Sequence, residues 1–285
     1  MMILIYILLA TLCYSEARHN RIVGGSPVYT NDDTFKFITS FQNNKKQHWC
    51  AGSFIHPRWI LTAAHCVKPI PPKRIVVNTY NPFKGDSTVL VTMKDYIHPM
   101  YTTVHAGNDI ALIHLKDHSH KITRVVLNNC YKEEPFEKDG QNLIVAGWGL
   151  VKEVVNHTFP PQQKDLLQVE VPIVNQTTCQ VKYNLNLKAN QICAGDWDHG
   201  GVDSCQGDSG GPLVYKKGNL TTLVGIVSYG KGCARPNFPG VYTRVSSFID
   251  WIQSTMGNDK IQVRSATCRP TPNPTIKPTK KKWGI

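Results

Sequence analysis

Short apolar runs fill most of the chain, and turn-forming residues separate each run from the next. From Ile22 to about Thr255 these runs are rich in Val, Ile, Thr and aromatic residues. Examples are the runs over 74–78, 87–92, 142–146 and 220–229, with turns at 81–82, 84–86 and 217–219. Runs of this length and composition, without regular alternation of strands and helices, predict an antiparallel all-β body.

One helix is predicted, near the end of this body. Its apolar stripe consists of Phe248, Ile249 and Ile252. Ser246 or Ser247 is the expected N-cap and Gly257 the stop signal, so the predicted helix covers 246–256. Residues 261–285 form a predicted Pro-rich basic tail, because 268–285 contain four prolines, five basic residues and no acidic residue.

The first 17 residues have the pattern of a secretory signal peptide. Residues 1–12 are almost entirely apolar, but a membrane-spanning helix needs ~20 such residues. Ser15 and Ala17 place small residues where signal peptidase reads them, so cleavage is predicted after Ala17. The start carries no Lys or Arg, which leaves a short buried strand or helix as the alternative. A signal peptide predicts a secreted, extracellular protein that does not span a membrane.

Cysteine usage agrees with export. The chain has nine cysteines, of which Cys13 lies in the predicted signal peptide, so 9 − 1 = 8 remain. An even number in an exported chain predicts a disulfide framework, although eight cysteines permit 105 pairings. Three Asn-X-Thr sequons, at Asn156, Asn175 and Asn219, are candidate glycosylation sites.

The formal net charge is +12. Removing residues 1–21 leaves 32 − 2 = 30 basic and 20 − 1 = 19 acidic side chains, or +11. Such a charge suits sulfated glycans, anionic membranes or nucleic acid. For the body we prefer the alternative, solubility without a specific partner, and we predict no nucleic-acid partner. An anionic glycan remains a candidate partner for the tail, whose Lys280-Lys281-Lys282 run is otherwise a solvated charge run.

Three separate motifs contain the residue types of nucleophilic catalysis. Ser209 lies in the Gly-rich segment Gly207-Asp208-Ser209-Gly210-Gly211-Pro212, which taken alone is equally suited to a tight structural turn. His65 lies in Leu61-Thr62-Ala63-Ala64-His65-Cys66, and Asp109 precedes the apolar run Ile110-Ala111-Leu112. A serine hydroxyl is a weak nucleophile that needs a base, a group that orients the base, and donors for the developing oxyanion.

These motifs, in the chain order His, Asp, Ser, resemble the trypsin branch of the chymotrypsin-like serine peptidases. The resemblance implies two six-stranded antiparallel β-barrels, at about 22–130 and 141–245, within a peptidase domain of residues 22–260. It also implies a catalytic triad of His65, Asp109 and Ser209, and an oxyanion hole formed by the N–H groups of Gly207 and Ser209. No cofactor is implied.

The resemblance also implies cleavage after Arg or Lys. Asp203 occupies the position of the carboxylate at the floor of the specificity pocket, and Ser204 beside it suits both basic side chains. The other expected substrate-binding residues are Gln206, Ser228, Tyr229, Gly230 and Gly240. Tyr229 departs from the family, which usually has Trp here, so preference beyond the first pocket does not transfer.

Activation by cleavage between Arg21 and Ile22 follows from the resemblance of Arg21-Ile22-Val23-Gly24-Gly25 to the family's junction. Residues 18–21 are then the propeptide, and the new Ile22 ammonium pairs with Asp208. Before cleavage, His48 is expected to hold Asp208.

By the same resemblance, three disulfides join Cys50 to Cys66, Cys179 to Cys193 and Cys205 to Cys233. Cys130 and Cys268 remain and are predicted to pair with each other, with a bond to a second chain as the alternative. His114, His118, His120 and Asp117 lack tight ligand spacing, and 67–92 lacks the paired glutamates of a calcium loop, so no metal site is predicted.

The sequence therefore predicts a secreted, monomeric serine endopeptidase, made as a zymogen, with protein substrates and protein protease inhibitors as partners. Two alternatives stay open. One is a catalytically weak protease homologue that acts as a binding or regulatory module, and the other is a secreted esterase.

Overall fold

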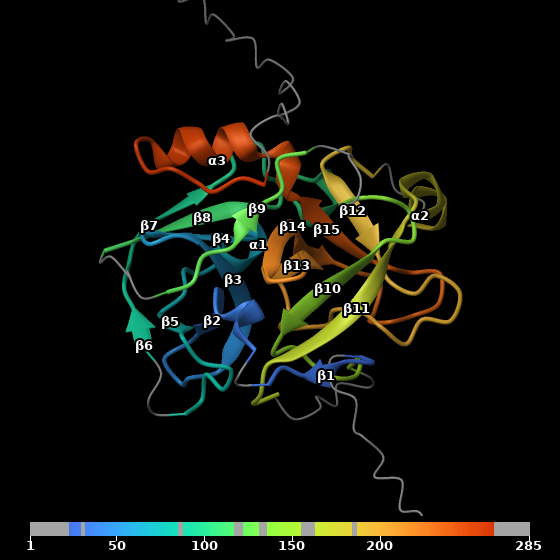
Figure 1. Cartoon of the computed structure of the whole chain (residues 1–285), viewed down its shortest axis with the longest axis horizontal. Helices are drawn as coiled ribbons and strands as arrows, with labels where there is room; N and C mark the ends of the chain where they lie inside the picture. The colour runs from blue at the N-terminus through green and yellow to red at the C-terminus, as the bar shows by residue number, and fades with distance from the viewer. Residues whose placement is uncertain are drawn as a thin grey trace, which may run out of the picture.

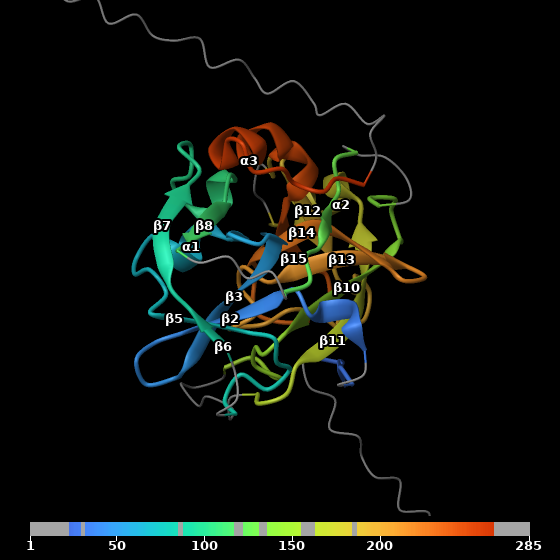
Figure 2. The ribbon, with the colours of Figure 1, turned by 60° about the vertical axis from the view of Figure 1, so that its left-hand side comes forward.

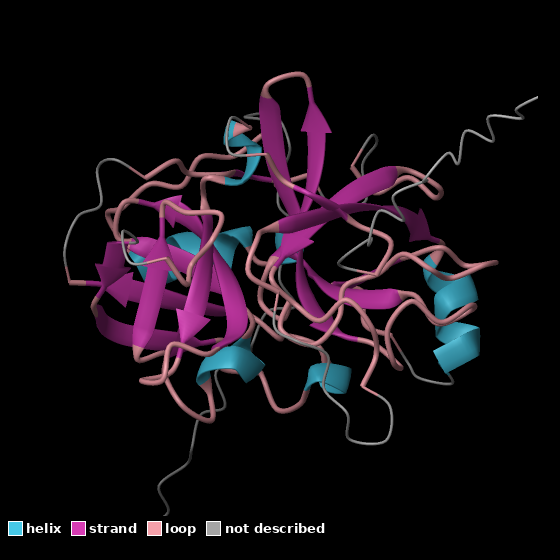
Figure 3. Ribbon diagram, turned by 90° about the horizontal axis from the view of Figure 1, so that it is seen from below, coloured by secondary structure: helices cyan, strands magenta, loops and turns pink. Residues whose placement is uncertain are grey.

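The computed structural model describes residues 23–29, 32–84, 88–116, 122–130, 136–154, 163–183 and 187–264. Two curved β-sheets stand side by side, and short helices lie at their margins (Figures 1 and 3). The predicted all-β, chymotrypsin-like fold class is thereby confirmed. The predicted signal peptide and propeptide, and the tail beyond residue 264, lie outside the described residues.

The first of these, the N-terminal sheet, has seven antiparallel strands in the order β6-β5-β2-β3-β4-β8-β7. Its strands are β2 Ile38–Gln42, β3 His48–His56, β4 Trp59–Thr62, β5 Arg74–Val77, β6 Thr88–Leu90, β7 Thr92–Ile97 and β8 Ala111–Leu115. The two edge strands, β6 and β7, are consecutive in the chain and only Val91 separates them. A one-residue connection between opposite edges forces the sheet to curl, although it stays open.

The second sheet, the C-terminal barrel, is closed. Its path runs β11-β10-β13-β14-β15-β12, and β12 pairs back with β11. Its strands are β10 Asn142–Gly147, β11 Leu167–Val174, β12 Gln191–Ala194, β13 Pro212–Lys217, β14 Leu220–Tyr229 and β15 Gly240–Arg244. Two short strands join it: β1 Ser26–Pro27 pairs with β11, and β9 Val126–Leu127 runs parallel to β14.

Alternation along the strands explains why these sequences form a barrel. In β11 the side chains of Leu167, Val169, Val171 and Ile173 point into one apolar cluster, whereas Glu170 between them is exposed. Successive side chains of a strand face opposite sides, so a period of two places one face in the core and the other in solvent.

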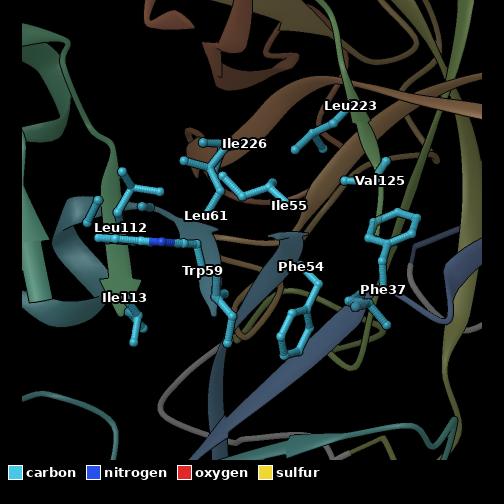
Figure 4. Close-up of a cluster of buried hydrophobic side chains, with 14 of the residues drawn as sticks. Phe37, Phe54, Ile55, Trp59, Leu61, Leu112, Ile113, Val125, Leu223 and Ile226 are labelled. Carbon is cyan, nitrogen blue, oxygen red and sulfur yellow. The ribbon is translucent and has the colours of Figure 1, made fainter. Parts of the chain in front are cut away.

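A continuous apolar core joins the two sheets. Phe54, Leu61 and Leu112 of the N-terminal sheet belong to the same buried cluster as Leu223 and Ile226 of β14 (Figure 4). These side chains are at most 1% exposed. Burial of apolar surface is the main favourable term in folding, so this shared core fixes how the two sheets sit against each other. Candidate site residues from both sheets meet beside this core, because Ser228 and Thr243 of the barrel bond to Asp109.

The terminal helix exists, but it begins later than predicted. α3 spans Ile249–Met256, its N-cap is Phe248, and no side chain caps it. The expected caps, Ser246 and Ser247, instead lie in a 3-10 turn at Val245–Ser247, where the Ser246 hydroxyl donates to Glu137. In the view of Figure 2, α3 lies across the top of the molecule.

Two further helices were not predicted. The short helix α1, Ala64–Val67, follows β4. The helix α2, Gln176–Tyr183, has only one buried residue, Cys179, so it lacks the apolar stripe by which helices are recognised. Its start is marked by Asn175, whose side-chain oxygen accepts the N–H of Thr177 at 2.9 Å. No helix among the described residues is long and apolar enough to cross a bilayer.

The chain after α3 is tied to the N-terminal sheet through Asp259. Its carboxylate accepts hydrogen bonds from Arg58 Nη2 at 2.7 Å and from Trp59 Nε1 at 2.7 Å. Beyond it, the first residues of the predicted tail still contact the body, because Leu127 N–H donates to the carbonyl of Gln262 at 2.9 Å.

Replacing Asp259 tests this anchor. Asp259→Ala leaves the buried indole N–H of Trp59 without its acceptor, so we expect the free energy of unfolding to fall by about 1–3 kcal/mol, measured by urea denaturation. Asp139→Ala, which removes an exposed carboxylate, is the matched control and should change little.

The pH dependence of the same variant gives a second check. Burial raises the pKa of Asp259, but hydrogen bonds from Trp59 and Arg58 and the nearby positive charge outweigh burial, so its pKa lies below 3.8. A carboxylate whose pKa is lower in the folded state than in the unfolded state stabilises the fold at pH values above the unfolded pKa. This stabilisation is lost as the pH falls through the folded pKa. The stability gap between wild type and Asp259→Ala should therefore persist at pH 5 and narrow below pH 3.8. A gap that is absent at neutral pH would contradict the anchor.

Candidate active site

Strand register brings His65 and Asp109 together. β4 and β8 are antiparallel neighbours, and Thr62 at the end of β4 is paired with Ala111 at the start of β8. His65 lies three residues beyond Thr62 on α1, and Asp109 lies two residues before Ala111. Two segments that leave the same end of neighbouring strands must lie beside each other.

The contacts between these two residues are direct. Asp109 Oδ1 accepts the backbone N–H of His65 at 2.9 Å, and Oδ2 lies 2.8 Å from His65 Nδ1. Asp109 is only 1% exposed. A buried carboxylate accepts hydrogen bonds, so it keeps the proton on Nδ1 and leaves Nε2 of the neutral ring with a free lone pair.

The C-terminal barrel completes the surroundings of Asp109. The Ser228 hydroxyl donates to Asp109 Oδ2 at 2.6 Å, and the Thr243 hydroxyl donates to the Asp109 carbonyl at 2.8 Å. Ser228 lies where the pairing of β14 with β15 shifts register, and such irregularities redirect a side chain. Sequence reasoning assigned Ser228 to substrate binding and missed its contact with Asp109.

Ser209 lies in the loop before β13, residues 205–211, which we call the serine loop. This loop is held between the two sheets. The Ser209 carbonyl accepts the N–H of Ala51 from the N-terminal sheet at 2.8 Å, and Gly210 N–H donates to Val227 in the barrel at 2.9 Å. Gly210 has a φ of +75°, and a Cβ there would lie 2.3 Å from Thr62 Oγ1 and 3.1 Å from Cys66 Sγ. Only glycine fits, and the close approach places Ser209 beside the segment that carries His65.

The Ser209 hydroxyl forms no hydrogen bond with His65 in the described part of the chain. Such bonds are often long or poorly aligned without substrate and tighten in the substrate complex.

Two backbone N–H groups near the Ser209 hydroxyl are candidate donors to an oxyanion, those of Gly207 and of Ser209 itself. Among the described residues, neither the N–H of Gly207 nor that of Ser209 has a hydrogen-bond acceptor. His48 orients this loop, because its Nε2 lies 2.8 Å from the Gly207 carbonyl oxygen while its Nδ1 lies 2.8 Å from the Ser40 hydroxyl. Gly207 has a φ of +100°, a conformation that L side chains rarely adopt.

Asp208 is completely buried beneath this loop. Its oxygens accept the N–H groups of Gly149, at 2.8 Å, and Cys205, at 2.9 Å. Burial raises the pKa of Asp208 to about 6, although these hydrogen bonds oppose the shift. Two partners were expected for Asp208, His48 before cleavage and Ile22 after it. His48 bonds the carbonyl of the neighbouring Gly207, and Ile22 lies outside the described residues.

Asp203 is the other buried acid of this region, 2% exposed. Its oxygens accept the N–H groups of Ser204, at 2.8 Å, and Ala234, at 3.0 Å. No described Lys, Arg or His forms an ion pair with it. Burial raises the pKa of Asp203 to about 7, and nearby Asp208 contributes to the rise.

The residues expected to line the specificity pocket surround Asp203 to different extents. A Cβ on Gly240 would lie 2.7 Å from Asp203 Oδ1, so a side chain there would cover the carboxylate. Ser204 lies 3.3 Å from the buried hydroxyl of Tyr242, a contact that the sequence did not signal. Gln206 is exposed on the serine loop, and Gly230 is exposed at the end of β14.

Three disulfides agree with the predicted pairs: Cys50–Cys66, Cys179–Cys193 and Cys205–Cys233. Cys50 and Cys66 lie near His65, but sulfurs joined to each other do not supply thiolate ligands for a metal. The predicted Cys130–Cys268 bond involves Cys268, which is outside the described residues, as are His118, His120, Asp117 and Asn156.

This combination of fold and site is that of a serine protease, and sequence comparison gives the family. The model of the Trypsin family matches residues 22–252. A tryptase from Mus musculus is 35% identical over 256 residues, covering 84% of this chain and 89% of the relative. "Trypsin Tyr p 3.0101" from Tyrophagus putrescentiae is 37% identical over 246 residues, covering 84% and 81%. The chain belongs to the trypsin family of serine proteases.

The raised pKa of Asp203 predicts pH-dependent binding of cations. We expect an amidinium such as benzamidine to pair with the ionised carboxylate, so its affinity should be constant above pH 7 and fall up to tenfold per pH unit below it, measured by calorimetry. Asp203→Asn should bind weakly at every pH, with little slope. Equal wild-type affinity at pH 5 and pH 8 would contradict the assignment.

Proposed function

We propose that the chain is a secreted endopeptidase that hydrolyses peptide bonds after Arg or Lys. The observation that carries this proposal is the buried Asp203 carboxylate, which has no described cation as a partner and lies close to the serine loop. An isolated buried charge is costly, and a guanidinium or ammonium of the substrate relieves that cost. Protein substrates follow from the protease domain itself.

The proposed reaction is acyl transfer to water. Ser209 Oγ attacks the carbonyl carbon of the scissile bond, and His65 Nε2 takes the hydroxyl proton. Asp109, held by Ser228, stabilises the resulting imidazolium. The unused N–H groups of Gly207 and Ser209 then bind the oxyanion. His65 returns the proton to the leaving amine, and water releases the acyl group by the same steps in reverse.

Specificity in this proposal is electrostatic and steric together. Asp203 supplies the charge. Gly240 has no side chain that would cover the Asp203 carboxylate, so a long basic side chain can approach it. Ser204 adds a hydroxyl beside the carboxylate. An esterase without a charged pocket would gain nothing from a buried acid at this place.

Activation by cleavage after Arg21 is the second part of the proposal. Val23, just after the proposed cleavage site, already lies against the segment that contains Asp203, because the N–H of Asp203 donates to the Val23 carbonyl at 3.4 Å. Asp208 is fully buried and has no cationic partner among the described residues, so a new ammonium at Ile22 would supply the positive charge that this carboxylate lacks. Pairing would hold the serine loop in its working shape.

Export, glycosylation and partners complete the proposal. Disulfides are typical of oxidising compartments, which supports secretion. Asn175 and Asn219 are both exposed, as glycan attachment requires. We expect a monomer that protein protease inhibitors bind at the active site, with an anionic glycan as a candidate partner for the tail.

Replacement of the nucleophile tests the mechanism. Ser209→Ala should lower kcat for an Arg-amide substrate by at least a thousandfold, because the three side chains act as a unit. Binding of benzamidine should be retained, since Asp203 is untouched. A variant that keeps more than about a tenth of wild-type turnover would contradict the proposal, because one decade corresponds to only ~1.4 kcal/mol.

The activation site has a matched control within the propeptide. After treatment with trypsin, Arg21→Gln should stay latent, whereas Arg18→Gln and Arg21→Lys should become active, because only cleavage before Ile22 frees the required amine. N-terminal sequencing and active-site titration with a fluorophosphonate measure both events. Full activity of uncut Arg21→Gln would overturn the proposed activation.

A further inference from the structure

The strand end beside the pocket offers an unused backbone edge. Gly230 follows β14 directly and is exposed, and its N–H and C=O have no backbone partner among the described residues. An extended peptide adds to such an edge through main-chain hydrogen bonds. A substrate whose basic side chain enters the pocket at Asp203 would then run past Gly230 with its preceding residues.

An aromatic cluster supports this edge. Tyr183 packs edge-on against Tyr229, with ring centroids 6.2 Å apart, and against Phe238, at 5.8 Å. The Tyr183 hydroxyl donates to the Pro239 carbonyl at 2.6 Å and accepts the N–H of Lys231 at 3.3 Å. These contacts fix the turn after Gly230, so the backbone of Lys231 is held in place.

Two lysines converge on this cluster from distant parts of the chain. Lys182 Nζ lies 5.7 Å and Lys231 Nζ 4.4 Å from the centroid of the Phe238 ring. Both side chains are exposed, and neither forms an ion pair with a described acid. Arg235, in the same loop as Lys231, differs because Glu153 neutralises it through contacts of 2.6 and 2.8 Å. Its charge is therefore not available in the same way.

We propose that Lys182 and Lys231, with Tyr183, Tyr229 and Phe238, form a lysine–aromatic surface that selects substrates with Asp or Glu three or four residues before the scissile bond. The proposal rests on the proposed function, since Asp203 must hold the basic residue that sets the register.

The register follows from strand geometry. Side chains of an extended peptide are spaced by about 3.3 Å along the strand. With a basic residue in the pocket, the next residues upstream pass Gly230 and reach the adjacent lysine–aromatic surface within two to three positions. Carboxylates there meet two unpaired ammonium groups, whereas a Lys or Arg at the same positions meets like charge.

A peptide series measures this preference. Each substrate has a fixed Arg directly before the scissile bond and carries Glu, Ser or Lys at the third and fourth residues before that bond. The value of kcat/KM is determined for each substrate with the wild-type enzyme. We expect Glu substrates to exceed Lys substrates by about three- to tenfold at low salt. The ratio should fall toward one in 0.5 M NaCl, where the screening length is only ~3–5 Å.

Variants assign the effect to the two lysines. The double variant Lys182→Gln and Lys231→Gln should bring the Glu-to-Lys ratio close to one, and Lys231→Glu should invert it. Lys217→Gln removes an exposed lysine from the end of β13 and should retain the wild-type ratio.

The outcomes separate this inference from the proposed function. Cleavage after Arg with no preference for Glu, or a preference that survives the double variant, overturns the lysine–aromatic surface and leaves the protease assignment standing. Failure to cleave after Arg or Lys in any of these peptides, with Ser209 fully titrated, overturns the pocket assignment and the inference together.

Discussion

The carboxylate of Asp109 is the point on which the site depends. It comes from the N-terminal sheet and binds both the backbone and the ring of His65, while Ser228 and Thr243 of the C-terminal barrel bind it from the other side. A charge that is 1% exposed must be matched by several donors, and those donors come from both halves of the fold. The hydrogen bonds that this one carboxylate requires therefore also hold the two sheets together at the site.

Asp203 and Asp208 extend the same principle to the serine loop. Both are buried, both accept backbone N–H groups, and burial raises the pKa of each, to about 7 and about 6. Neither shift would arise if an internal cation compensated the charge fully. These two buried charges are suited to pair with a substrate side chain and with a new N-terminus, so the proposed specificity and the proposed activation depend on one six-residue stretch from Asp203 to Asp208.

The sequence predicted what is carried by local motifs and alternation. Strand β14 was predicted with its observed ends, and the pairing of three disulfides followed from the resemblance. It did not predict α2, because a polar helix held by the Asn175 cap and the Cys179–Cys193 bond has no apolar stripe. The bond from Ser228 to Asp109 depends on a register shift between two strands, which periodicity alone does not reveal.

Charge placement explains how a chain of net charge +12 can contain the negative pocket that we propose at Asp203. Asp203 and Asp208 are buried, where the surrounding dielectric is low and their fields are strong, whereas the lysines are solvated and screened. A substrate cation at Asp203 therefore experiences the nearby carboxylate more than the distant surface charge. Lys182 and Lys231 matter for the opposite reason: their aromatic support holds two surface charges beside the path of the substrate, so they can act on its upstream residues without weakening the pocket.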